Sequence, residues 1–234
     1  MRSFADVGIL MFIAVTLGGC ATGGGPVASI PAAPLSVLPP KAGDLAMPMP
    51  TAPMPAAERT AVTPSGYISF CLRFPDQCAT TPGAPARVAL TPDVWAMLRK
   101  VNDAVNDSIW PEDDERHYGR AEYWNIPTDG YGDCEDYALT KRKQLISLGL
   151  PIGALRLAVV ITGDGGRHAV LTVVTDKGDF VLDNMKNEVL SWNRTGLTWV
   201  ERQDPSTQLG WVSLQPADRM LADQTAPLIT GTAK

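Results

Sequence analysis

The sequence contains no apolar run long enough to cross a lipid bilayer as a permanent helix. The longest run, residues 7–17, is shorter than the ~20 apolar residues that a spanning helix needs. Basic charge is also scarce: 20 Lys and Arg stand against 25 Asp and Glu, the net charge is −5, and no strongly basic patch is present. These features argue against nucleic acid as a partner. The hydrophobic share of 45% is nevertheless enough for a packed core.

Several motifs of common enzyme classes are missing as well. Histidine occurs only twice, at His117 and His168, and no H-E-x-x-H or other histidine-rich zinc spacing is present. There is no G-x-S-x-G nucleophile elbow and no phosphate-binding P-loop, since the glycines of residues 163–166 form only a loop between strands. What remains for chemistry is a small set of cysteine, histidine and carboxylate side chains.

Residues 1–20 have the proportions of a secretory signal, with an apolar run followed by small residues. The sequence L-G-G-C at residues 17–20 resembles the bacterial lipoprotein cleavage box, in which the cysteine is acylated and begins the mature chain. An ordinary cleaved signal is the alternative, because Asp6 and the weak positive charge depart from the ideal pattern. We therefore predict a lipoprotein-type signal peptide, lipidation at Cys20, and a protein of the periplasm that is lipid-anchored to a bacterial membrane.

The next 40 residues have a different composition. Residues 21–60 are rich in Pro, Ala and Gly, with little charge and no periodicity. Such a segment buries too little apolar surface to offset its ordering entropy, so we predict a disordered tether that favours polyproline II conformation. The folded domain is predicted at residues 61–215, and a flexible tail at residues 216–234.

Four cysteines are present. Cys71 and Cys78 lie seven positions apart in C-L-R-F-P-D-Q-C, and they could close a small disulfide loop in an oxidising compartment. Two buried free thiols on one helix face are the alternative, but Pro75 argues against an uninterrupted helix and favours the disulfide. Cys134 then remains as an unpaired cysteine.

Residues 91–109 are predicted to form a helix. Thr91 suits the cap, Pro92 the first helical position and Asp93 the first turn. The apolar residues at helical spacing are Val94, Met97, Leu98, Val101 and Val105. The polar, aromatic stretch that follows, up to residue 133, is predicted to be a long ordered loop.

A second helix is predicted to begin at Cys134. Asp133 suits its N-cap, Asp136 its third position and Gly149 its C-terminal end. The predicted inward side chains are Ala138, Leu139, Leu145, Ile146 and Leu148, and the predicted outward ones are Lys141, Arg142 and Lys143.

Three strands follow, at residues 154–162, 167–175 and 180–184, and the last two are joined by a turn. A helix followed by an antiparallel sheet indicates an α+β domain. Cys134 at a helix start, His168 on a strand and Asp183 on the next strand could act together. The helix N-terminus favours a thiolate, a histidine can take the thiol proton, and a carboxylate can orient the histidine.

Each of these three residues also has a structural explanation: a buried thiol, a half-buried strand histidine and a turn aspartate. The strand register is a further open question. A two-residue turn at residues 177–178 would pair Thr172 with Asp183 and leave His168 roughly 13 Å away along the strand. Direct contact needs a register centred near residues 175–176, a β-bulge or strong coiling.

Long segments of the sequence resemble the bacterial transglutaminase-like cysteine protease family, a branch of the papain-like superfamily. They are GDCEDYALTKRKQLISLGLP, LRLAVVITGDGGRHAVLTVVTDKGDFVLDN, FCLRFPDQC, VNDAVNDSI and YGRAEYWNIP. The resemblance covers about residues 66–200 and implies a papain- or transglutaminase-like α+β fold. It implies Cys134 as nucleophile, His168 as general base and acid, and Asp183 as the orienting carboxylate.

The resemblance also implies a biological setting. The best-known members are periplasmic, calcium-dependent proteases that cleave large surface adhesins and are restrained by a membrane receptor for a cyclic dinucleotide. The expected partners are therefore a protein substrate of the envelope, the membrane through the lipid anchor, and a membrane-bound regulatory receptor. The lipoprotein box departs from the family pattern, since those members are soluble.

Carboxylates around Cys134 bind Ca²⁺ in calcium-dependent members, and the matching positions are Asp133, Glu135 and Asp136, with Asp129 as a weaker candidate. Crowded oxygen ligands suit Ca²⁺, and a cation would offset the negative charge that opposes a thiolate. Helix capping is the alternative explanation. Trp124 could line the substrate cleft, help form the oxyanion site or belong to the core.

The predicted function is that of a thiol endopeptidase of the cell envelope, with residues 61–215 as its catalytic domain. Transglutaminase- or amidase-type acyl transfer on the same three residues is one alternative. A non-catalytic lipoprotein that binds envelope peptide or murein is another, and it predicts that Cys134, His168 and Asp183 are not all present.

Overall fold

The structure is a computed structural model, and it describes residues 47–55, 59–80, 83 and 85–215. All of these residues belong to one compact unit. The signal peptide, Cys20, the greater part of the tether and the tail at residues 216–234 lie outside the described residues.

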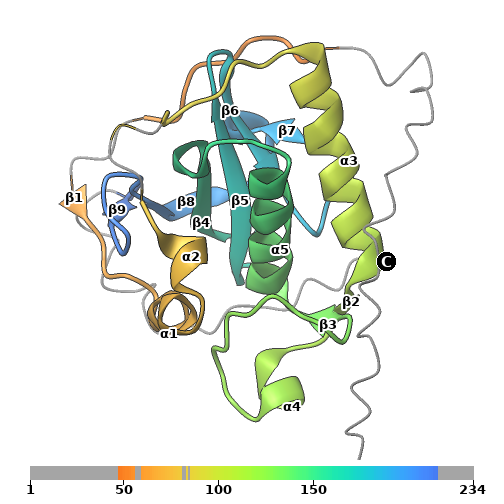
Figure 1. Cartoon of the computed structure of the whole chain (residues 1–234), viewed down its shortest axis with the longest axis vertical. Coiled ribbons are helices and arrows are strands. Elements are labelled where there is room, and N and C mark those ends of the chain that lie inside the picture. The colour runs from red at the N-terminus through yellow and green to blue at the C-terminus, as the bar shows by residue number, and fades with distance from the viewer. Residues whose placement is uncertain (1–46, 56–58, 81–82, 84, 216–234) are drawn as a thin grey trace, which may run out of the picture. The chain divides into compact units, whose positions relative to one another are not determined.

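An antiparallel sheet forms the centre of the described domain, with strand order β1-β9-β8-β4-β5-β6-β7 (Figure 1). Its strands are β1 Arg59–Thr60, β4 Leu155–Ile161, β5 Arg167–Thr175, β6 Gly178–Leu182, β7 Leu190–Ser191, β8 Thr198–Gln203 and β9 Trp211–Ser213. A small parallel pair lies apart from this sheet, formed by β2 Trp110–Pro111 and β3 Tyr131–Gly132. The antiparallel arrangement of β4, β5 and β6 confirms the sequence-based prediction.

Helices pack on this sheet and complete an α+β fold, as predicted. They are α1 Ser65–Arg73, α2 Pro75–Cys78, α3 Pro92–Ser108, α4 Asp114–Tyr118 and α5 Cys134–Ser147, with 3₁₀ turns η1 Ile152–Ala154 and η2 Trp192–Arg194. Figure 1 shows α5 lying against β5, with α3 alongside it. The nucleophile candidate Cys134 is the first residue of α5, so this helix carries it directly onto the sheet.

The helix α3 forms for the reasons that its sequence suggests. The hydroxyl of Thr91 accepts a hydrogen bond from the backbone of Val94 at 3.2 Å, and Pro92 occupies the first position. Leu98, Val101 and Val105 are buried in the core, whereas Val94 is only half-buried. The core residue that the periodicity did not single out is Trp95, whose ring meets that of Phe180 edge to face at 5.4 Å between centroids.

The predicted outward face of α5 is wrong for Lys141 and Arg142, whereas Lys143 is exposed as predicted. Lys141 is 0% exposed, because α3 packs alongside α5. Arg142 is also buried, and its guanidinium donates to the carbonyl of Gln77 on α2 at 2.9 Å.

Leu148 was predicted to face inward but is 43% exposed, since it lies at the cap where the helix ends. Gly149 follows with φ 96°, and its N–H donates to the carbonyl of Ile146 at 3.0 Å.

The folded domain begins earlier than residue 61, where the sequence placed its start. Thr51 donates its N–H to the carbonyl of Lys177 at 3.0 Å, and the indole of Trp192 donates to the carbonyl of Ala52 at 2.8 Å. The side chain of Met54 is buried. Residues 47–55 are therefore held on the β6–β7 side of the sheet, although their composition is that of a tether.

Two short helices near the start of the domain are joined covalently. Phe74 ends α1, Pro75 begins α2, and the backbone break that Pro75 predicts is present. Cys71 and Cys78 form a disulfide with an S–S distance of 2.06 Å. Both cysteines belong to the hydrophobic core, so the disulfide holds the short loop between them against the core.

Gly66 on α1 makes room for a buried tryptophan. A Cβ at this position would lie 2.2 Å from Cδ1 of Trp124, and Trp124 is enclosed by Tyr67 and Trp211. We expect Gly66→Ala to lower the free energy of unfolding by about 1–3 kcal/mol through overpacking, even though Ala is the better helix former. Urea unfolding measures this change. The matched control is Gly163→Ala, where a Cβ meets nothing within 4 Å; equal effects of the two substitutions would contradict the prediction.

Candidate active site

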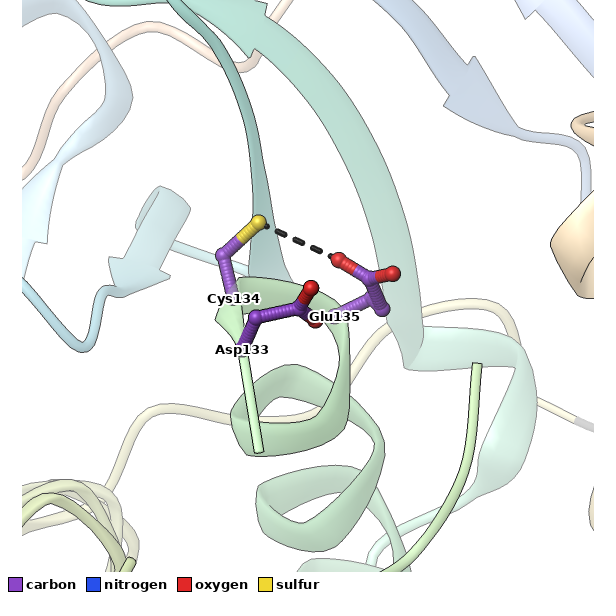
Figure 2. A group of neighbouring side chains, drawn as sticks. All are labelled: Asp133, Cys134 and Glu135. Carbon is purple, nitrogen blue, oxygen red and sulfur yellow. Dashed lines mark hydrogen bonds between the residues drawn. The ribbon is translucent and has the colours of Figure 1, made fainter. Parts of the chain in front are cut away.

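Cys134 lies at the start of α5 and is completely buried. Its Sγ accepts a hydrogen bond from the backbone N–H of Ala169 on β5 at 3.3 Å, and its thiol donates to Oε2 of Glu135 at 3.2 Å (Figure 2). The first contact places the sulfur against the strand segment that contains His168. The second shows that the thiol is directed at one of its carboxylate neighbours.

His168 and Asp183 meet directly. Nε2 of His168 and Oδ1 of Asp183 are 2.8 Å apart, and both side chains are buried. The same Oδ1 accepts the backbone N–H of Met185 at 2.9 Å. Asp183 follows the last residue of β6, so it lies at a strand end and its position depends on the segment after it.

The observed register explains this contact. Thr175 pairs with Gly178 and Leu171 with Leu182, so the turn is Asp176-Lys177. Continued by one residue, this register sets Asp183 level with Val170, and His168 is the next residue on the same face. Such diagonal neighbours are ~7–8 Å apart at Cα and within reach of long side chains. The register lies between the two that the sequence left open.

The second ring nitrogen of His168 remains available. Nδ1 is buried and has no hydrogen-bond partner among the described residues. Because Nε2 faces a carboxylate, it is assigned the hydrogen in the neutral ring, which leaves Nδ1 as the lone-pair acceptor. The arrangement can therefore accept a proton at Nδ1 while Asp183 holds the ring orientation.

Charge and burial act differently on the members of this group. Burial alone would raise the pKa of Asp183, but the hydrogen bond and the charge of His168 lower it below its usual value. The pKa of Cys134 is raised well above that of a free thiol, first by burial and then by the charges of Glu135 and Asp133. In this arrangement the thiol keeps its proton unless the neighbouring negative charge is compensated.

Four buried carboxylates gather beside the start of α5, and we call them the carboxylate cluster: Asp114, Asp133, Glu135 and Asp136. Asp114, Asp133 and Asp136 each place a ligand atom within 4.8 Å of the other two, and Asp133, Cys134 and Glu135 do the same. Every member has an oxygen without a hydrogen-bond partner among the described residues: Asp114 Oδ1, Asp133 Oδ1, Glu135 Oε1 and Asp136 Oδ2.

Without a compensating positive charge, the carboxylate cluster destabilises the folded state. Burial is the largest cause that raises the pKa of Asp133 to about 7, and it also raises the pKa values of Asp114, Glu135 and Asp136. Buried carboxylates without partners destabilise a fold strongly. The acids form two overlapping groups whose ligand atoms lie within 4.8 Å of one another. Carboxylate oxygens are the ligands that a hard cation such as Ca²⁺ prefers, so the donor chemistry of these residues fits a calcium ion.

Helix capping does not account for these acids. Asp133 occupies the N-cap position of α5, but its side chain accepts no capping hydrogen bond. Oδ1 of Asp136 instead accepts the backbone N–H of Asn125 at 2.6 Å, which ties the preceding loop to the helix. A Cβ at Gly132 would lie 2.6 Å from Oδ2 of Asp136, so a glycine is needed where the chain passes this carboxylate.

One candidate from the sequence lies elsewhere, and one cluster member was missed. Oδ2 of Asp129 contacts Nε2 of His117 at 3.0 Å, and this side chain is 50% exposed, outside the cluster. Asp114 was missed because it belongs to four successive acids at residues 112–115, and nothing in that run shows which one is buried. Its carboxylate accepts the N–H of Tyr123, which anchors the loop over the cluster.

Trp124 is a core residue rather than part of a cleft or an oxyanion site. Its side chain is completely buried against the rings of Tyr67 and Trp211. Its indole N–H donates to Oε2 of Glu122 at 3.1 Å, so this donor is already engaged. Of the alternatives that the sequence left open for Trp124, the structure supports the core.

Comparisons with known proteins identify the family of this chain. The family model for the bacterial transglutaminase-like cysteine proteinase BTLCP matches residues 57–219. Calcium-bound LapG of Legionella pneumophila is 28% identical, with a TM-score of 0.42, over 47% of this chain and 65% of that one. EGTA-treated LapG of the same organism is 30% identical, with a TM-score of 0.41, over 47% and 62%. The chain thus spans less than two thirds of LapG, and no curated protein sequence matches it.

The family model extends over well more than half of the 234 residues and contains the helix start, β5 and the end of β6. The protein therefore belongs to the bacterial transglutaminase-like cysteine proteinase family.

Proposed function

We propose that this protein is a thiol endopeptidase that uses Cys134, His168 and Asp183 as a catalytic triad and depends on calcium. The observation that supports the triad best is the 2.8 Å contact between Nε2 of His168 and Oδ1 of Asp183. It leaves Nδ1 of His168 free to act as a base, while the N–H of Ala169 holds the sulfur of Cys134 beside this strand.

The chemistry follows from these positions. Sγ of Cys134 attacks the carbonyl carbon of the scissile bond, and its proton passes to Nδ1 of His168. The imidazolium, stabilised by Asp183, then gives this proton to the leaving amine as the C–N bond breaks and a thioester remains. His168 next takes a proton from water, the resulting hydroxide equivalent displaces the sulfur, and a free carboxyl group and the thiol are restored. Backbone N–H groups at the start of α5 are the donors for the oxyanion.

Calcium is proposed to be held by the carboxylate cluster. The unpartnered oxygens of Asp114, Asp133, Glu135 and Asp136 support this, and the structures of calcium-bound and EGTA-treated LapG support it in a related protein. A bound cation supplies positive charge that offsets the negative field opposing a thiolate at Cys134.

The setting of the reaction is also a proposal. No helix among the described residues is long and apolar enough to span a membrane. The lipoprotein box at residues 17–20 supports a lipid anchor at Cys20 in the periplasm. Exported or surface proteins of the envelope are then the substrates, and a membrane-bound receptor of the kind implied by the family resemblance is the regulator.

Profiling of new protein N-termini in the cell envelope tests the proposed function. Cells that express the full chain are compared with cells that express Cys134→Ala, and cleavage is expected to fall by about 10³-fold or more because the nucleophile is lost. The matched control is Lys143→Ala, an exposed residue of the same helix, which should cleave at the wild-type rate. Undiminished cleavage by Cys134→Ala would refute the assignment.

A further inference from the structure

A repeated tripeptide in α3 has no part in the mechanism described so far. Val-Asn-Asp occurs at residues 101–103 and again at residues 105–107. The interval of four residues places both valines on one helix face and both asparagines on the adjoining face, one turn apart. The valines are buried in the core, which leaves the asparagines to be explained.

Both asparagines bind the segment that follows β6. Nδ2 of Asn102 donates to the carbonyls of Lys186 and Asn187 at 2.9 and 3.0 Å. Nδ2 of Asn106 donates to the carbonyls of Asp183 and Lys186, both at 3.1 Å. Each amide thus uses both of its hydrogens, and the two together serve three carbonyls of one turn.

This turn lacks the support of the sheet. β6 ends at Leu182 and β7 begins at Leu190, so Asp183 lies outside the ladder of strand hydrogen bonds. Within the turn itself, the N–H of Met185 donates to Oδ1 of Asp183 at 2.9 Å, and the N–H of Lys186 reaches the carbonyl of Asp183 at 3.4 Å. Among the described residues, Asn102 and Asn106 bind the backbone carbonyls of Asp183, Lys186 and Asn187 and so connect this turn to α3.

We propose that Asn102 and Asn106 are positioning residues that hold the 183–187 turn on α3 so that the carboxylate of Asp183 meets Nε2 of His168. This inference rests on the proposed function, because it assigns a purpose to the geometry of the triad. The valines of the repeat anchor α3 in the core, and the asparagines transfer that fixed position to Asp183. The carboxylate of Asp183, although it lies at a strand end, is thereby held in place by α3.

The test uses the full chain with Asn106→Leu, which keeps the branching at Cγ and removes both donors, and with Asn102→Leu. The first readout is the downfield proton resonance of Nε2–H in His168, which is easily assigned in a chain with two histidines. The second is the pH dependence of alkylation of Cys134 by iodoacetamide, followed by mass spectrometry. Both are recorded below the unfolding temperature of every variant.

We expect the His168 resonance to broaden or disappear in Asn106→Leu, and alkylation at neutral pH to slow by about tenfold, since a misplaced partner weakens a catalytic group strongly. The alkylation curve should move to higher pH, because a loosely held Asp183 stabilises the imidazolium less. Asn106→Ser, which retains one donor, should fall between Asn106→Leu and the wild type. Asp107→Ala, an exposed neighbour on α3, should match the wild type.

A purely structural role would lower the unfolding temperature and leave both readouts unchanged in the folded protein, and that outcome would overturn the inference. If either leucine variant fails to fold, Asn106→Ser decides: an unaltered resonance and alkylation curve in this variant would equally overturn it. Neither readout requires proteolysis. Unchanged readouts beside an inactive Cys134→Ala would remove only this inference, whereas an active Cys134→Ala would remove the proposed function.

Discussion

Calcium added to the chelated protein is expected to raise its unfolding temperature by roughly 8–16 °C. At calcium 1,000-fold above the dissociation constant, binding to the folded state alone contributes about 4 kcal/mol, and a domain of this size responds with roughly 2–4 °C per kcal/mol. The physical reason is the carboxylate cluster, in which Asp114, Asp133, Glu135 and Asp136 each have a buried oxygen without a partner among the described residues. Differential scanning calorimetry with EGTA and then with excess Ca²⁺ measures the shift.

The stability of the chelated protein should also depend on pH. Folding raises the pKa of Asp133 to about 7 and raises those of Glu135 and Asp136. The unfolded chain loses these protons near pH 4, so the folded state binds more protons between about pH 4 and 7. Stability is therefore greatest at or below about pH 4 and falls as the pH rises through 7. Calcium should remove this decline, and its binding should release protons.

Two variants test whether the carboxylate cluster, rather than a nearby acid, binds the calcium ion. Asp136→Asn removes one of the charges that we assign to the ion, and the calcium-induced shift should shrink by at least half. Asp129→Asn lies outside the cluster and should keep the full shift. If calcium leaves the unfolding temperature of the wild type unchanged, the calcium site is wrong; if Asp129→Asn loses the shift, the residues that we assign to it are wrong.

The second large effect is expected at Lys141, whose amine is completely buried and has no hydrogen-bond partner among the described residues. Burial lowers its pKa to about 7, against the opposing influence of Asp183 and Asp103. Between pH 7 and about 10.5 the unfolded chain keeps a proton that the folded chain has lost, so stability rises with pH across this window. The full difference is on the order of 5 kcal/mol, as an upper bound.

Replacing this lysine with an apolar side chain of similar length should abolish that rise. We expect Lys141→Met to be more stable than the wild type by about 2–4 kcal/mol at pH 6–7, since a buried charge is replaced by a methionine that packs. The advantage should vanish near pH 10. Urea unfolding at a series of pH values measures the difference, and Lys143→Met on the exposed face of α5 is the control. Parallel pH curves for wild type and Lys141→Met would contradict the prediction.

The sequence predicts the helices and strands around the site because their signals are local. Thr91 and Pro92 mark the start of α3, and the β-rich runs mark β4 and β5. The trio Cys134, His168 and Asp183 could be proposed because each residue stands at a recognisable element boundary or strand position. Its direct contact could not be predicted, since the register depends on which two residues form the turn, and several choices satisfied the pattern.

Burial of polar residues was not predictable in the same way. Lys141 and Arg142 look like the solvent face of α5, because charge normally marks that face. Lys141 is enclosed because β5 and α3 pack on this helix, and Arg142 is enclosed beside α2, where the carbonyl of Gln77 accepts its hydrogen bond. Both contacts are properties of the tertiary fold. Asp114 joined the carboxylate cluster for the same reason: α4 and its loop turn it inward.

The number of residues in the turn between β5 and β6 determines where Asp183 lies relative to His168. The turn Asp176-Lys177 is fixed by Thr175, whose hydroxyl donates to the carbonyl of Gly178 at 2.7 Å and accepts the N–H of Lys177 at 3.0 Å. His168 lies seven residues from Thr175, roughly 23 Å along the strand. One residue more or less in this turn would send Asp183 to the opposite face of the sheet. The length of a turn at the far end of the strand from His168 thus decides on which face of the sheet Asp183 lies.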